Sequence, residues 1–178
     1  LVTAVARGRI RQAFTSLRLS QGTADLKTVK GILRAHPHLD GRIKKHMGSV
    51  CMHAKGIASS ETTASMIVVY AGGGFTVWVT GSPYPCVSLY KPLTTENFEE
   101  PRFTDPSHIL RYAEEAAIFN RRLLRRPVKV REELLRLAEG YEEDFEEALR
   151  GTEDRKKTCA EAWAREKAFR REAETLLK

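Results

Sequence analysis

The stretch that most constrains the fold is residues 49–92, where short apolar runs alternate with turn residues. The runs at residues 62–70 and 75–80 are rich in β-branched and aromatic side chains, and a glycine triplet joins them. Glycine readily adopts the positive φ that a tight connection needs, so these runs predict an antiparallel hairpin. Trp78 is expected in the core, and residues 86–90 are expected to form a further short strand.

The hairpin's first run is apolar on both faces once past its first residues. Because successive side chains of a strand point to opposite faces, this pattern predicts a strand buried between two layers. Three hydroxyl side chains stand at the start of the run: Thr62, Thr63 and Ser65. They can line a pocket, or they can simply reflect the preference of threonine for strands.

Helical periodicity flanks the strands on both sides. Apolar residues recur every three or four positions over residues 1–19 and 26–36, and again after residue 105. Because the strands are confined to the middle of the chain, these helices must pack on one sheet. The sequence therefore predicts the α+β class, an antiparallel sheet with packed helices. In the second helix the expected buried stripe is Leu26, Val29, Ile32 and Leu33.

Short polar signals mark where the helices begin. Thr23 or Asp25 can cap the helix of residues 26–36, and Asp105 stands before a proline at a first helical position. A cap for the last helix is expected within residues 152–154. We predict that residues 1–104 form the sheet-containing part and residues 105–178 a helical tail.

The net charge of +7 is unevenly distributed. Residues 1–104 hold 13 Lys and Arg against 6 Asp and Glu, whereas residues 105–178 hold 17 of each. A basic surface attracts nucleic acid or anionic substrates. The basic residues here are scattered and come without an aromatic stacking motif, so a nucleic-acid partner is not favoured over a solvated face.

Three cysteines leave at least one unpaired under any disulfide scheme: Cys51, Cys86 and Cys159. The chain shows no secretory signal and no apolar run long enough to span a bilayer. We expect a reducing, cytoplasmic compartment and no membrane partner. Cys86 is interpreted as a small buried residue rather than a nucleophile, because no base has a fixed spacing to it.

The pair Cys51-x-His53 has the residue types of a zinc site. On a strand, positions two apart share a face, so both side chains could meet one ion. Three histidines precede the pair without a fixed spacing that would complete a site: His36, His38 and His46. The spacing therefore favours ordinary histidines, and we expect neither a metal nor a cofactor.

An ordered series of motifs over residues 6–92 resembles the C-terminal part of secernins, a dipeptidase-like branch of the N-terminal-nucleophile cysteine hydrolases. The series begins with Gly8-Arg9-Ile10 and continues with Gly31-Ile32-Leu33-Arg34, Thr62-Thr63-Ala64-Ser65-Met66, Thr80-Gly81-Ser82-Pro83-Tyr84-Pro85 and Lys91-Pro92. Cys51-x-His53 is more similar to the related penicillin acyltransferase group.

The resemblance implies an α/β/β/α sandwich, of which residues 1–104 would be the C-terminal part of the catalytic domain. In such enzymes a cysteine at the mature N-terminus attacks an amide carbonyl, and its own α-amino group is the general base. This chain begins with Leu1 and its cysteines are internal. We therefore expect the missing N-terminal part or a second chain to carry the nucleophile, and this chain alone to be inactive.

The resemblance also suggests which residues support the reaction. Arg9 is matched to an arginine that reaches toward the nucleophile in related bile-salt-hydrolase-like enzymes, where a fixed cation favours thiolate and binds a substrate carboxylate. Arg7 and Arg11 are the alternatives, and a plain surface role is possible for each. The residues expected to bind substrate are Thr62, Thr63, Ser65 and His53.

Two function classes follow. The first is a cysteine-dependent amidohydrolase that acts on a dipeptide or another small amide. The second is a non-catalytic interaction module of the secernin type, in which the charged helices after residue 105 bind a protein partner or a second copy of the chain. An upstream segment that supplies a processed N-terminal cysteine would favour the first.

Overall fold

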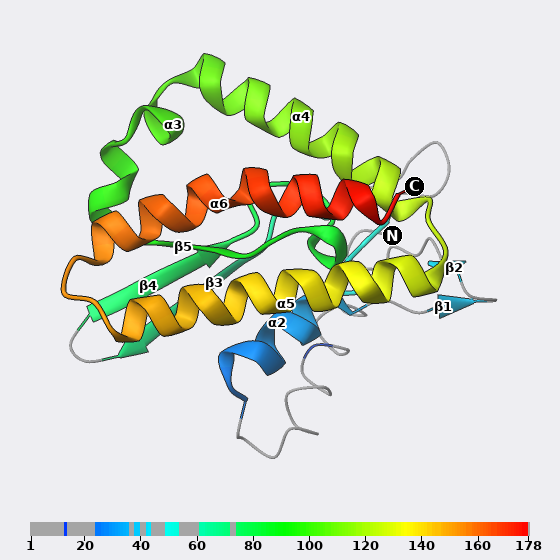
Figure 1. The fold of residues 1–178 in the computed structure, drawn as a ribbon, viewed down its shortest axis with the longest axis horizontal. Helices are drawn as coiled ribbons and strands as arrows, with labels where there is room; N and C mark the ends of the chain where they lie inside the picture. The colour runs from blue at the N-terminus through cyan, green and yellow to red at the C-terminus, as the bar shows by residue number, and fades with distance from the viewer. Residues whose placement is uncertain are drawn as a thin grey trace, which may run out of the picture.

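The computed structural model describes Ala13 and residues 24–35, 38–39, 42–43, 49–53, 61–71 and 74–177. Figure 1 shows the elements in chain order: α2 (Leu26–Arg34), β1 (His38–Leu39), β2 (Arg42–Ile43), β3 (Met66–Ala71), β4 (Gly74–Val79), the 3-10 helix η1 (Pro85–Val87), β5 (Lys91–Leu93), the 3-10 helix η2 (Thr95–Glu99), α3 (Pro101–Thr104), α4 (Pro106–Leu124), α5 (Val128–Arg150) and α6 (Arg155–Thr175). The predicted α+β class is confirmed. The helix predicted over residues 1–19 lies outside the described residues apart from Ala13.

The main sheet has three antiparallel strands in the order β3-β4-β5. The predicted hairpin is confirmed, with Ile67 opposite Trp78 in β3 and β4. Trp78 also faces Pro92 of β5 and is buried in the core, as expected. The edge position of Pro92 fits its lack of a backbone N–H, because a central strand would need that donor.

The strand predicted at residues 86–90 is wrong. Tyr84 has a φ of 64° in the left-handed region, which ends the extended path after Pro83. The backbone N–H groups of Val87 and Ser88 then donate to the carbonyls of Tyr84 and Pro85, which closes the turn of η1. The backbone returns to a strand only at Lys91.

The prediction that β3 is buried on both faces is also wrong. Ile67 and Val69 pack against the core, but Met66 and Tyr70 on the other side are 65% and 80% exposed. No described element buries that side of β3. We call this set the open face of the sheet; it comprises Met66, Val68, Tyr70 and, across the hairpin, Phe75.

Helices α5 and α6 run antiparallel and pack on each other and on β5, in front of the sheet in Figure 1. The core joins Trp78 and Tyr90 from the sheet region to Leu134 and Phe145 of α5 and to Phe169 of α6. The helices after residue 105 and the sheet therefore share one hydrophobic core.

Three aspartates cap helices as the sequence predicts. The side chain of Asp25 accepts a hydrogen bond from the Thr28 N–H at the start of α2. Asp105 begins α4 in the same way, and Asp154 begins α6 by accepting from the Lys157 N–H. Of the two caps left open for α2, the structure uses Asp25.

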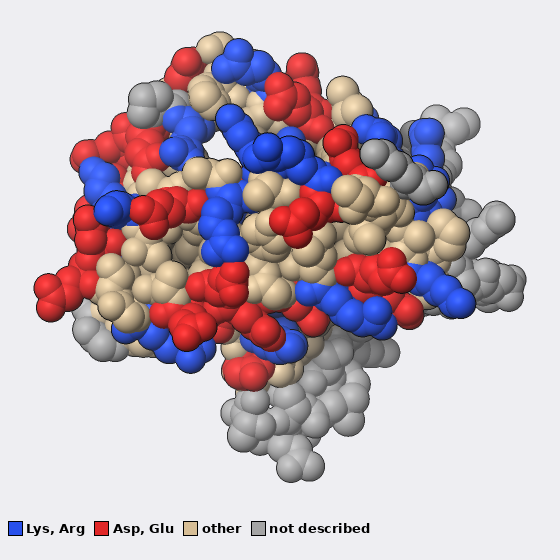
Figure 2. Space-filling view, in the orientation of Figure 1, with Lys and Arg blue, Asp and Glu red and all other residues tan. Residues whose placement is uncertain are grey.

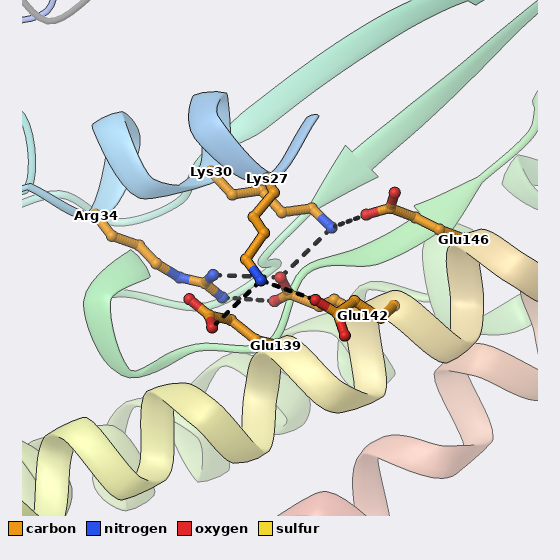
Figure 3. A pocket seen from close by; sticks show the side chains of 7 residues that line it. Lys27, Lys30, Arg34, Glu139, Glu142 and Glu146 are labelled. Carbon is orange, nitrogen blue, oxygen red and sulfur yellow. Dashed lines mark hydrogen bonds and ion pairs between the residues drawn. The ribbon is translucent and has the colours of Figure 1, made fainter. Parts of the chain in front are cut away.

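The buried side of α2 differs from the predicted stripe. Its most buried residues are Lys30 and Arg34, whereas the expected apolar positions are only partly buried. The reason is a carboxylate on α5: Glu142 accepts from Arg34 at 2.5 and 3.2 Å and lies 3.4 Å from the Lys30 ammonium (Figure 3). Lys30 also pairs with Glu146 and lies 4.1 Å over the Trp78 ring.

Charges of both signs alternate over α5 and α6 on the face shown in Figure 2. No continuous basic surface forms over these two helices on that face. Within the described residues, no helix combines the length and apolar character needed to cross a bilayer.

Candidate functional site

Cys51, His53 and Cys86 converge on one point. The Nε2 atom of His53 lies 3.6 Å from the Cys51 sulfur and 3.5 Å from the Cys86 sulfur. All three donor atoms lie within 4.8 Å of one another. Cys51 is 0% and His53 3% exposed, and Cys86 is partly buried. We call these three residues the thiol–imidazole cluster.

Backbone hydrogen bonds hold Cys51 and His53 in place. The Cys51 N–H donates to the Ala35 carbonyl just after α2, at 3.0 Å. Met52, between the pair, exchanges two bonds with Thr62: its N–H donates to the Thr62 hydroxyl, and its carbonyl accepts from the Thr62 N–H. This segment is a bend rather than the expected strand, yet both side chains point to one site.

Cys86 reaches the cluster because η1 is pinned from two sides. The Ser88 hydroxyl donates to the Tyr84 carbonyl at 2.9 Å, which holds the turn closed. Arg34 of α2 donates to the Pro85 and Ser88 carbonyls on either side of Cys86. Since Arg34 is itself bound to a buried carboxylate of α5, α2 and α5 together position this thiol.

The imidazole of His53 is oriented by stacking. Its ring lies parallel to that of Tyr84, with centroids 5.4 Å apart and an interplanar angle of 8°. The Tyr84 hydroxyl donates to Glu61 at 2.5 Å. The left-handed turn at Tyr84 thus brings two neighbouring side chains to His53: the ring of Tyr84, which stacks on the imidazole, and the thiol of Cys86.

The two thiols of the cluster are electrostatically unequal. A hydrogen bond from Cys86, together with the nearby His53, lowers the pKa of Cys51 to about 5, although burial acts against this. Burial and the neighbouring Cys51 raise the pKa of Cys86 well above its ordinary value. Of the two sulfurs, Cys51 is therefore the better hydrogen-bond acceptor and Cys86 the better donor.

Of the hydroxyl residues expected to bind substrate, Thr62 contacts the segment that carries this cluster. Thr62 is partly buried and bonded to the segment that carries Cys51 and His53. The Ser65 hydroxyl accepts from the Tyr90 hydroxyl at 2.6 Å, and Thr63 is exposed. His53, expected to bind substrate, is buried. Arg9 and its alternatives lie outside the described residues.

No pattern in the sequence connects Cys86 to the Cys51-x-His53 pair. Thirty-three residues separate Cys86 from His53, and no fixed motif spans that interval. The closest local signal is the paired prolines around Tyr84, which indicate a rigid segment but not its turn. In the structure, η1 lies against the bend at Cys51, and this brings Cys86 to the pair.

Chemically, the cluster offers two sulfurs and one nitrogen at close range. Among the described residues this is the group whose His, Cys, Asp or Glu donors could hold a metal ion. In the structure all three cysteines are free thiols. Comparison of the chain with family models, with curated proteins and with solved structures finds no match.

Proposed function

We propose that this chain supplies the C-terminal part of a secernin-like, cysteine-dependent amidohydrolase that cleaves the C–N bond of a dipeptide or another small amide, with the nucleophile on a different segment. The observation that carries the proposal is the open face of the sheet. It adds a structural argument to the motif resemblance over residues 6–92.

The open face is apolar and lies at the edge of the sheet. Met66 and Tyr70 are mostly exposed, and Val68 and Phe75 extend the surface along the hairpin. An exposed apolar patch of this kind marks a contact surface. In an α/β/β/α sandwich a second sheet stacks on this side while helices cover the other. Ile67 and Val69, on the other side of β3, pack against the core that the sheet shares with α5 and α6, which supports this proposal.

The hydroxyls at the start of β3 divide into two roles. Thr63 is exposed, so its hydroxyl can contact a substrate held between the sheets. Thr62 and Ser65 are engaged inside the molecule, by the Met52 N–H and the Tyr90 hydroxyl, and they position the strand. His53 is buried and follows Met52, which Thr62 binds, so it takes the same positioning role.

In the proposed reaction, the thiolate of the N-terminal cysteine adds to the amide carbonyl and forms a bond between sulfur and carbon. The C–N bond then breaks, and the amine leaves with a proton from the nucleophile's own ammonium group. Water attacks the thioester, which releases the acid and restores the thiol. Residues of this chain bind and orient the substrate.

The test is turnover of a dipeptide and acyl-amide panel by the longest product of the gene, with Thr63→Ala as the probe. Loss of one hydrogen bond to substrate lowers kcat/KM by about 10-fold. Thr95→Ala is the matched control, because Thr95 is also exposed but begins η2. Arg9→Ala is expected to lower turnover more strongly without changing the melting temperature.

Two outcomes overturn the proposal. If the longest product hydrolyses no amide in the panel, the non-catalytic interaction module becomes the better account of this fold. If turnover occurs and Thr63→Ala matches Thr95→Ala, the start of β3 is not part of the substrate site.

A further inference from the structure

We propose that Cys51, His53 and Cys86 form a zinc-binding site. The sequence interpretation expected no metal, because Cys51-x-His53 alone offers two ligands and the upstream histidines have no fixed spacing. The fold adds Cys86 as a third ligand, and the inference is independent of the proposed hydrolase activity.

The donor atoms already have the spacing of a coordination sphere. With zinc–sulfur bonds of about 2.3 Å and a zinc–nitrogen bond of about 2.1 Å at tetrahedral angles, sulfur and nitrogen ligands lie about 3.6 Å apart. The two sulfur–nitrogen distances in the cluster are 3.6 and 3.5 Å. Two sulfur ligands of zinc lie about 3.8 Å apart, so the thiols, within 4.8 Å, need to close by at most about 1 Å.

The ligand types select the metal. Two thiolates and one imidazole suit zinc and are poor ligands for magnesium or calcium, which prefer oxygen. The three protein ligands leave the fourth tetrahedral position to water or to a further donor. Binding as thiolates would cancel the charge of a divalent ion, which makes a buried site electrostatically acceptable.

The surroundings orient the ligands before any ion binds. Tyr84 stacks on the His53 ring, and Arg34 fixes the carbonyls on both sides of Cys86. Such support of the ligands by neighbouring residues is typical of metal sites. Because the Cys51 N–H is bonded to the end of α2, a bound ion would join α2, the bend at Cys51 and η1.

The main rival is a disulfide between Cys51 and Cys86. A disulfide would explain the approach of the two sulfurs, but it would not explain why His53 Nε2 lies 3.6 Å from one sulfur and 3.5 Å from the other. The zinc site and the disulfide differ in the number of free thiols that they leave. A zinc site keeps all three cysteines reduced, whereas a disulfide leaves Cys159 as the one free thiol.

The first experiment measures zinc by elemental analysis in the purified 178-residue chain, prepared without chelators. We expect about one ion per chain in the wild type and in Cys159→Ala, and a loss of most of it in Cys51→Ala and Cys86→Ala. Cys159→Ala is a matched control because it also removes a buried thiol. Circular dichroism of each variant shows whether it folds.

A second measurement needs no variant and so avoids any folding defect. Cobalt(II) added to chelator-treated wild type should produce thiolate-to-cobalt charge-transfer absorption, and zinc should remove it and raise the melting temperature. Absence of stoichiometric zinc together with no cobalt–thiolate absorption overturns the proposal. So does zinc retained equally in Cys86→Ala and the control, or a thiol count of one in the purified chain.

Discussion

At the residue scale, the most demanding polar group outside the site is Lys91. Its side chain is fully buried and donates to Glu166 at 2.8 Å, to the Tyr112 hydroxyl at 2.8 Å and to the Thr80 carbonyl at 3.1 Å. Glu166 accepts in addition from Arg170 at 2.9 Å. A buried charge is tolerated when it is paired and fully hydrogen-bonded, and Lys91 meets both conditions.

The pKa values of this pair move in opposite directions. Burial acts to lower the pKa of Lys91, but Glu166 and Tyr112 outweigh it and raise that pKa above 10.5. Burial acts to raise the pKa of Glu166, but Lys91 and Arg170 outweigh it and lower that pKa below 4.5. Stability from Glu166 is therefore present above pH 4.5 and is lost as the pH falls through its folded pKa.

We predict that Glu166→Gln destabilises the chain at pH 7 by about 3 kcal/mol, because it leaves the Lys91 ammonium buried beside a neutral amide. As the pH falls below 4.5 and through the lowered folded pKa of Glu166, the wild type also loses this carboxylate's charge, so the difference between the two proteins should shrink. Urea unfolding at a series of pH values measures it. A difference that stays constant down to the acid limit would show that the ion pair does not account for the loss.

At the element scale, α6 depends on a local signal at its start. The Asp154 carboxylate accepts from the Lys157 N–H at 3.0 Å and satisfies one of the free donors of the first turn. We predict that Asp154→Ala lowers the free energy of unfolding by about 1 kcal/mol, and that Asp154→Asn, which keeps the accepting oxygen, loses much less. Thermal unfolding compares the three proteins. Equal losses in both variants would mean that charge, not capping, is what matters.

The helix starts and the hairpin could be predicted because residues close by in the sequence determine them. Asp105 before a proline marks the start of α4, and the glycine triplet marks the hairpin of β3 and β4. The buried side of α2 was not predictable in this way. Lys30 and Arg34 of α2 face inward because they pair with Glu146 and Glu142 of α5. These partners lie more than a hundred residues later in the chain. The spacing of apolar residues within α2 carries no information about carboxylates so far away in the sequence.

At the scale of the whole molecule, the same limit applies to the thiol–imidazole cluster. Residues two apart, Cys51 and His53, were identified together from the sequence because their spacing is fixed by the backbone. Cys86 joins them only through a left-handed turn at Tyr84 and the hold of Arg34 on both sides of the thiol. The hydroxyls beside the cluster were identified through the motif resemblance, but their division into exposed and engaged groups required the fold.

The open face of the sheet is exposed and apolar, so it can bind a second copy of the chain. Its strand β3 offers apolar side chains, and among the described strands β4 alone pairs with it, a combination that promotes association. We predict that the purified chain self-associates with rising concentration, and that Met66→Lys with Tyr70→Lys suppresses this. Ile118→Lys is the matched control, because Ile118 is 61% exposed but lies on α4. Sedimentation velocity at several concentrations measures the association. If Ile118→Lys suppresses it equally, or the wild type stays monomeric throughout, the open face is not a contact surface, and the argument for a second sheet on it fails as well.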